Sequence, residues 1–94
     1  MQQEKIIRAM FMGHEIIARN FWCVTSEAFT AEATLAFNGT VVDRTTELSP
    51  RKARLGAMLI DGVNSHAVEV LFGGWFIVRM KILIDGRKVA GNLR

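Results

Sequence analysis

The chain has 94 residues, half of them hydrophobic, and a formal net charge of +3. This length predicts a single domain over residues 1–94, and the single cysteine excludes an internal disulfide. The charge falls short of a nucleic-acid-binding tail, no apolar run approaches the roughly 20 residues of a membrane span, and the N-terminus lacks a signal-peptide core. We therefore expect a cytoplasmic protein that does not associate with membranes.

Residues 2–12 allow two interpretations. Their large apolar residues recur at helical spacing: Ile6, Ile7, Met10 and Phe11. Glu4 in the first turn and Gly13 at the end also suit a helix. The same apolar run fits a buried strand, which is the alternative to the N-terminal helix that we expect.

Two strands are predicted over residues 15–25 and 29–37, and a third begins at Thr40 after the dipeptide Asn38-Gly39. This dipeptide favours the positive φ angles of a two-residue hairpin turn. The first half of the chain is therefore expected to form an antiparallel meander.

A three-residue loop between the first two strands would set their register. Phe21 would then lie opposite Ala33, and Cys23 opposite Ala31, on the apolar face of the meander. We expect Cys23 to be a small core residue rather than a reactive thiol. Small alanines facing larger side chains would let this meander interdigitate with a second sheet.

Residues 50–60 are predicted to form a strand, with a helix as the alternative. Ser49 and Pro50 suit a helix start, but the apolar residues between 53 and 60 would surround a helix rather than share one face. An apolar run that leads into a tight turn fits a buried strand better.

Residues 66–90 show the clearest pattern, that of three antiparallel strands. Apolar residues alternate with charged and mixed residues over 76–84, and Asp85-Gly86 then favours a type I′ turn. This turn sets three pairs: Ile84 with Arg87, Leu83 with Lys88 and Ile82 with Val89. A three-residue loop, Gly73-Gly74-Trp75, sets four more: Phe72 with Phe76, Val70 with Val78, Val68 with Met80 and Glu69 with Arg79.

These elements predict a mainly β protein in which two antiparallel meanders pack as a small sandwich or flattened barrel. An α+β arrangement with a second helix near 50–60 is the alternative. An offset of 47 residues lays Asn38-Gly39 on Asp85-Gly86 and suggests a pseudo-repeat of residues 1–47 and 48–94. Since only four positions are identical across this alignment, the alternative is that unrelated meanders share the pattern.

The residues with reactive side chains do not form a catalytic, metal or nucleotide motif. His14 and His66 have no second ligand at metal spacing, and neither makes a nucleophile and base pair with Cys23 that the sequence would reveal. Trp22 opposite Glu32 would set a carboxyl beside an aromatic ring, but a solvated or ion-paired carboxylate is the stronger expectation. We expect no metal, no cofactor and no enzymatic activity.

Three basic residues gather on one face of the last hairpin: Arg79, Lys81 and Lys88, with Trp75 at one end. A basic sheet face with an aromatic neighbour is a candidate site for single-stranded nucleic acid or another anionic ligand. Only one aromatic lies near it, and Glu69 opposite Arg79 would neutralise part of the charge. Nucleic-acid binding is therefore the alternative and not the favoured function.

The same face carries a candidate protein interface, because its apolar residues would be exposed in a monomer. They are Leu71, Ile77, Leu83 and Trp75. An apolar surplus without evident chemistry favours a small non-catalytic binding protein that forms a homodimer and contacts a protein partner. A further alternative is a small-molecule binder or enzyme with a pocket between the sheets, near Trp22, Glu32 and Cys23.

Overall fold

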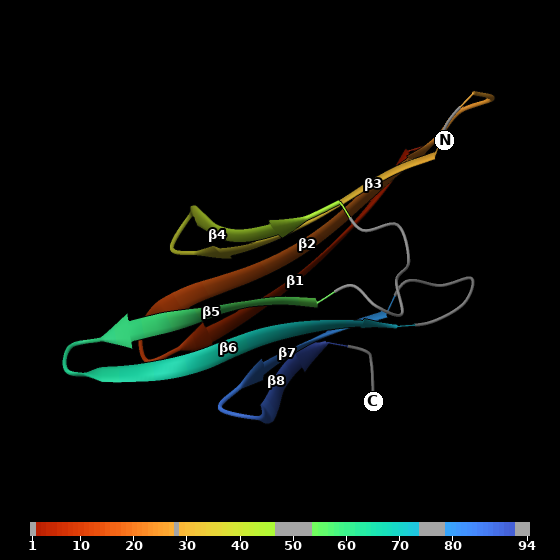
Figure 1. Ribbon diagram of the computed structural model, residues 1–94. Helices are drawn as coiled ribbons and strands as arrows, with labels where there is room; N and C mark the ends of the chain where they lie inside the picture. Colours follow the sequence, from red (N-terminus) through yellow and green to blue (C-terminus); the bar gives the residue numbers. More distant parts are fainter. Residues whose placement is uncertain (1, 28, 47–53, 74–78, 92–94) are drawn as a thin grey trace.

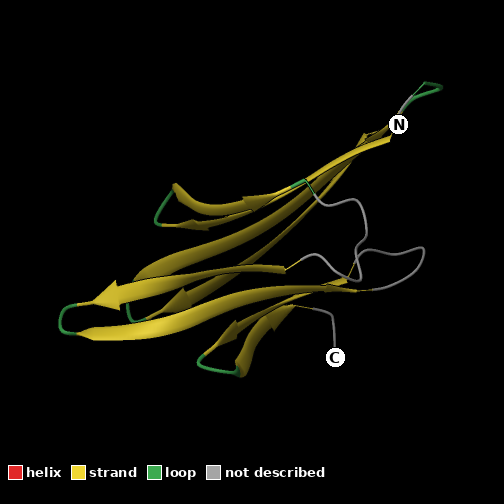
Figure 2. Ribbon diagram, viewed as in Figure 1, coloured by secondary structure: helices red, strands yellow, loops and turns green. Residues whose placement is uncertain are grey.

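The computed structural model describes residues 2–27, 29–46, 54–73 and 79–91 of the chain. These residues form strands joined by turns, with no helix among them (Figure 2). In chain order the strands are β1 (Gln2–Phe11), β2 (His14–Val24), β3 (Phe29–Phe37), β4 (Thr40–Thr45), β5 (Arg54–Asp61), β6 (Asn64–Gly73), β7 (Arg79–Ile84) and β8 (Arg87–Gly91).

The strands form two antiparallel sheets of four, with the orders β1-β2-β3-β4 and β5-β6-β7-β8. The sheets pack face to face (Figure 1). At the two sides of the sandwich, β1 contacts β8 and β4 contacts β5. The predicted mainly β architecture of two packed meanders is confirmed, and β5 is a strand as expected. The residues that would begin a second helix, Ser49 and Pro50, lie outside the described residues.

The expectation of an N-terminal helix was wrong, because residues 2–11 form the edge strand β1. Ala9 is buried while its neighbour Met10 is exposed, which is the alternation of a strand with one covered face. The Met12-Gly13 turn, with positive φ at both residues, pairs this strand with β2. A helix of this length is only marginally stable in water without tertiary packing. Pairing with β2 therefore determines the conformation of this segment, despite the helical spacing of its apolar residues.

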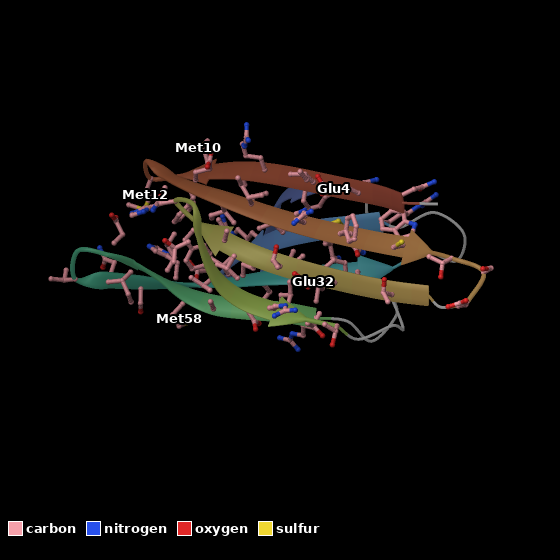
Figure 3. All side chains as sticks on the ribbon, turned by 90° about the horizontal axis from the view of Figure 1, so that it is seen from above. Glu4, Met10, Met12, Glu32 and Met58 are labelled. Carbon is pink, nitrogen blue, oxygen red and sulfur yellow. The ribbon has the colours of Figure 1, made fainter. Side chains whose placement is uncertain are left out.

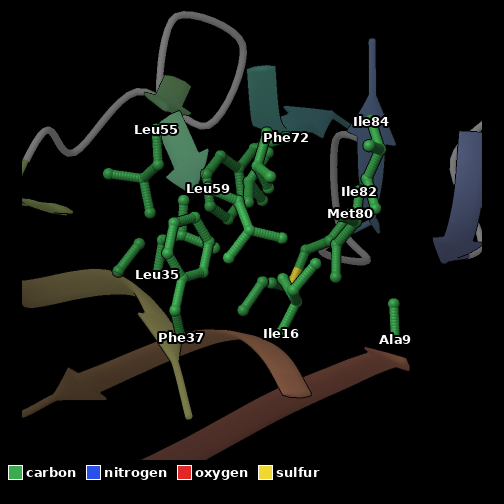
Figure 4. Close-up of a cluster of buried hydrophobic side chains, with 14 residues drawn as sticks. Ala9, Ile16, Leu35, Phe37, Leu55, Leu59, Phe72, Met80, Ile82 and Ile84 are labelled. Atoms are coloured by element: carbon green, nitrogen blue, oxygen red, sulfur yellow. The ribbon is translucent and has the colours of Figure 1, made fainter. Parts of the chain in front are cut away.

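Fourteen buried hydrophobic side chains from both sheets form one cluster (Figure 4). The first sheet contributes Ala9, Ile16, Ala18, Ala33, Leu35 and Phe37, and the second contributes Leu55, Leu59, Val68, Val70, Phe72, Met80, Ile82 and Ile84. All the alanines come from the first sheet, so small side chains on one face meet large ones on the other. Burying each large side chain contributes about 1.5 to 3 kcal/mol to the packing of the two sheets.

The register of β2 on β3 differs by one residue from the predicted one. Phe21 lies opposite Glu32, and Cys23 lies opposite Thr30. Thr25 has left the strand, and its hydroxyl accepts a hydrogen bond from the Glu27 N–H at 3.3 Å, which lengthens the connection. A shift of one residue reverses the faces, so Cys23 is half-exposed on the outer face of the first sheet instead of buried in the core.

The register of β6 on β7 differs by an even number of residues, so the predicted apolar face is kept. Val70 lies opposite Ile82 and Phe72 opposite Met80. The predicted Gly73-Gly74-Trp75 loop was wrong in its pairing, because Gly73 is itself paired with Arg79. Residues 74–78, on which the rest of that loop falls, lie outside the described residues.

In the last hairpin, the predicted pairs Ile84 with Arg87 and Leu83 with Lys88 are confirmed. A bulge then places Ala90, not Val89, opposite Ile82. Val89 is consequently exposed rather than part of the apolar face.

Gly91 ends β8 in a conformation that other residues rarely adopt, with φ +113°. An added Cβ would lie 2.1 Å from the Met80 carbonyl oxygen and 2.6 Å from Lys81 Cα, both of them backbone atoms. We expect Gly91→Ala to lower the free energy of unfolding by roughly 2 to 3 kcal/mol, as urea denaturation would measure. Gly56→Ala is the control, because its Cβ would meet only the Val68 carbonyl oxygen at 3.4 Å. If both substitutions lowered the free energy of unfolding equally, the close approach of Gly91 to the backbone of β7 would not be the cause of the loss.

Candidate functional site

Two histidines lie between the sheets, where each contacts a residue of the opposite sheet. They follow the β1–β2 and β5–β6 turns, which lie at one end of the sandwich (Figure 1). His14 begins β2, and His66 lies near the start of β6. Each is bound by the side chain of a tight turn, Asn38 or Asp85, and each contacts the opposite sheet. These two groups of residues are the part of the molecule in which polar side chains converge.

The His14 corner consists of His14, Glu15, Asn38 and Asp61. The Glu15 N–H donates to Asn38 Oδ1 at 2.9 Å, and the Asn38 N–H donates to the Glu15 carbonyl oxygen at 2.8 Å. The amide is thereby oriented so that Asn38 Nδ2 donates to His14 Nδ1 at 3.0 Å. In neutral His14 the proton lies on Nε2, which donates to Asp61 Oδ1 of the second sheet at 3.2 Å.

The His66 corner consists of His66, Ala67, Asp85 and Phe11. The Ala67 N–H donates to Asp85 Oδ1 at 2.9 Å, and the Asp85 N–H donates to the Ala67 carbonyl oxygen at 2.8 Å. Asp85 Oδ2 accepts a hydrogen bond from His66 Nδ1 at 2.7 Å. The bond from His66 and then that from the Ala67 N–H hold the pKa of the Asp85 carboxyl below its ordinary value of 3.8.

The two corners hold their histidines in opposite tautomers. Because the carboxylate of Asp85 can only accept, neutral His66 carries its proton on Nδ1 and a lone pair on Nε2. This Nε2 is buried and has no hydrogen-bond partner among the described residues, and the His66 ring meets the Phe11 ring edge-on at 4.8 Å. At the equivalent place, Asp61 accepts the Nε2 proton of His14. The side chain in the turn, an amide in Asn38 and a carboxylate in Asp85, thus sets the tautomer of the histidine. The tautomer in turn determines whether Nε2 requires a hydrogen-bond acceptor or a donor from the opposite sheet.

These contacts suit a structural role, in which each histidine links the two sheets. A general base must reach its substrate, whereas the free nitrogen of His66 is covered by protein. Within the described residues, His, Cys, Asp and Glu side chains do not gather in any group of three or more that could hold a metal ion. The same part of the chain contains no helix able to cross a membrane.

The structure does not bring together the residues of the predicted pocket. Trp22 lies on the inward face of β2, opposite Ala31, whereas Cys23 and Glu32 lie on the outer face of the first sheet. Glu32 Oε2 accepts a hydrogen bond from Arg44 at 2.8 Å. The expected ion-paired carboxylate is therefore present, without Trp22 as its neighbour.

Three of the four candidate anion-binding residues share the outer face of the second sheet. Arg79 and Lys88 are exposed, and Lys81 is half-buried. Glu69 lies opposite Leu83 instead of Arg79, and its carboxylate pairs with Arg54. The fourth candidate, Trp75, lies outside the described residues.

The candidate interface is only partly described, since Ile77 and Trp75 fall outside the described residues. Leu71 and Leu83 are both half-buried on the outer face of the second sheet. Leu71 lies opposite Lys81. The predicted register, which pairs Phe72 with Phe76 and thereby sets Leu71 opposite Ile77, is not the observed one.

Other exposed apolar side chains were not singled out from the sequence. In the described residues they are Ile6, Met10, Met12, Val41, Val42, Met58, Ile60, Val63 and Val89. Met10 and Met12 lie near the β1–β2 turn (Figure 3), and Val63 in the β5–β6 turn is fully exposed. The alternation of apolar and charged residues in β1 would have revealed Ile6 and Met10 had that segment been interpreted as a strand.

Comparison of the chain with family models, curated proteins and solved structures finds no match.

Proposed function

We propose that this protein is a small interaction protein without catalysis of its own, which self-associates and contacts a protein partner. The observation that supports this proposal is the exposed set of nine large apolar side chains in the described residues. Contiguous apolar surface bordered by charge is typical of protein interfaces.

On the outer face of the first sheet, apolar side chains alternate with charged ones, so that Ile6 lies opposite Arg19 and Ile17 lies opposite Arg8. Ile6 and Met10 are exposed there on β1, and Ile17 and Phe21 are half-buried on β2. Three ion pairs run among these residues: Arg8 with Glu15, Arg19 with Glu4 and Arg44 with Glu32. Exposed ion pairs of this kind contribute at most about 1 kcal/mol each to stability, so they leave the face able to exchange partners.

One observation favours anion binding as the second candidate function. None of the ion pairs within the described residues involves Arg79, Lys81 or Lys88, and Glu69 is occupied by Arg54. The outer face of the second sheet therefore presents positive charge that a phosphate backbone could bind.

Light scattering distinguishes the two functions when it is run over a range of protein concentrations, at low and high salt, on protein purified without nuclease. We expect a dimer free of nucleic acid, with a mass that changes little with salt because apolar contacts hold it. A monomer at every concentration would contradict self-association. A monomer that carries nucleic acid released by salt would transfer the proposal to the basic face.

A further inference from the structure

The four edge strands differ in how well they are protected against pairing with another chain. β4 and β8 are short, and both carry a register irregularity. On β5, the Gly56 N–H donates to Asp43 Oδ2 at 2.9 Å, which occupies a donor of that edge. Short strands, bulges and covering groups are the usual means of preventing edge-to-edge association.

Within the described residues β1 is neither short nor interrupted by a bulge, and its charged residues, including the inward-facing Lys5, are the protection that it carries. It is ten residues long, and it pairs with β2 without interruption from Gln2 to Phe11. In the sheet its pairing involves β2 alone, so its other edge carries unpaired strand positions. A long, regular edge with apolar side chains is a template for a further strand.

The tight turn after β1 determines which backbone groups face this edge. Residues flanking a two-residue turn exchange both of their backbone hydrogen bonds, so Phe11 bonds to β2 and alternate residues before it do the same. The N–H and C=O groups of Glu4, Ile6, Arg8 and Met10 consequently point away from β2. The same rule applied to β5 directs the Gly56 N–H outward, where it meets Asp43.

An antiparallel second copy must therefore pair these outward residues with each other, and charge selects one register. Glu4 opposite itself or Arg8 opposite itself would place like charges together, which is destabilising. Registers with Ile6 opposite Glu4 or Arg8 leave these charged residues without an opposite charge across the contact between the two β1 strands, which we call the seam. Only the register with Ile6 at the two-fold axis sets Glu4 opposite Arg8 of the second copy, twice.

The charges already on the sheet extend across this seam. Glu4 Oε2 accepts a hydrogen bond from Arg19 Nε at 2.7 Å, and Arg8 Nε lies 3.4 Å from Glu15 Oε2. The register would produce two rows of alternating sign, each running from Arg19 through Glu4 to the second copy's Arg8 and Glu15. On the inward face Lys5 would lie opposite Ile7 of the second copy, where its aliphatic stem can cover the isoleucine.

We propose that two copies of this chain pair β1 against β1, antiparallel, with Ile6 on the two-fold axis and Glu4 opposite Arg8 of the other copy. The first sheets of both copies then form one continuous sheet. This seam rests on the proposed self-association and specifies its surface, since Ile6 is 50% exposed in a single copy. An isologous contact of this kind closes on itself and ends assembly at two subunits.

Ile6→Lys tests the seam by placing two ammonium groups together at the axis, and Val63→Lys is its control with the same charge change at an exposed apolar site. We expect Ile6→Lys to raise the dimer dissociation constant at least tenfold in sedimentation or light scattering, and Val63→Lys to leave it unchanged. A wild-type monomer would overturn the proposed function as well as the seam. A wild-type dimer that Ile6→Lys does not weaken would overturn the seam alone.

Cross-linking tests the register in the assembled protein and does not depend on a destabilised variant. In a Cys23→Ser background, Ile6→Cys should give an inter-chain disulfide, because Cα atoms of a hydrogen-bonded pair lie about 5.5 Å apart. Met10→Cys should not, because the two copies of that position would be roughly 27 Å apart along the seam. Cross-linking at position 10 but not 6, or at neither, would overturn the register. If Ile6→Lys and Val63→Lys were both monomeric, the cross-linking result would still show whether the proposed register is correct.

Discussion

Ile82→Ala is expected to lower the free energy of unfolding by about 2 to 5 kcal/mol, because it removes a fully buried side chain from the centre of the core. Ile82 lies on β7 between Met80 and Ile84, both of which belong to the same buried cluster (Figure 4). A chain of this length has a total stability of roughly 5 to 14 kcal/mol, so the change removes a large share of it. Urea denaturation monitored by tryptophan fluorescence and by circular dichroism would measure the loss.

Ile60→Ala is the matched control, since Ile60 is 61% exposed on β5. The same atoms are removed, but little apolar surface returns to water and no cavity forms, so we expect a loss below about 0.5 kcal/mol. Both variants should be compared at one protein concentration, because self-association would add to the apparent stability. Equal losses would mean that the sheets do not pack through this cluster.

The elements that the sequence predicts correctly are those set by local chemistry. Asp85-Gly86 and Asn38-Gly39 both form tight turns with positive φ, and the pair Ile84 with Arg87 follows from the first of them. A positive φ is a property of the dipeptide itself, so no knowledge of distant residues is needed. The apolar face of β7 likewise follows from simple alternation.

Predictions that depended on loop length failed. The one-residue difference between β2 and β3 moved Cys23 from the expected core to the outer face. The connection is one residue longer than predicted, because Thr25 lies outside β2 and accepts a weak hydrogen bond from the Glu27 N–H. Strand patterning does not reveal this interaction. In β1 the error was one of period, since a short apolar run fits a strand and a helix equally well.

The histidine corners could not be found from spacing, because the strands β2 and β3 are longer than β6 and β7. Asn38 follows His14 by 24 residues, whereas Asp85 follows His66 by 19. An offset that aligns Asn38 with Asp85 does not align His14 with His66. The available signal was that each histidine follows a tight turn by one or a few residues and that each meander has an Asx-Gly turn. Only the paired strands bring those two features together.

Asp85→Asn is expected to destabilise the protein by changing the tautomer of His66. The new amide oxygen would still accept the Ala67 N–H, so its nitrogen would face His66 Nδ1, as Asn38 faces His14. The imidazole proton would then move to Nε2, which is buried beside Phe11. The unpaired buried nitrogen would change from an acceptor to a donor, and the hydrogen bond at Nδ1 would no longer involve a charged carboxylate, which weakens it. Nitrogen NMR shifts of the imidazoles would show the change of tautomer at His66 and none at His14.

Glu27→Gln is the control for the lost charge, because Glu27 is exposed in the β2–β3 connection, away from both corners. It should leave both tautomers and the unfolding transition nearly unchanged. An unaltered His66 spectrum in Asp85→Asn would mean that the carboxylate does not set the tautomer.

The same substitution has a defined pH dependence. The pKa of the Asp85 carboxyl is lowered in the folded protein, first by the hydrogen bond from His66 and then by the Ala67 N–H. A lowered folded pKa stabilises the protein fully above the unfolded pKa, about 4, and this contribution is lost as the pH falls through the folded value. The difference in stability between the wild type and Asp85→Asn should therefore shrink as the pH falls below about 4. A difference that instead grows as the pH falls below about 4 would mean that folding does not lower the pKa of Asp85, and would contradict the His66 corner.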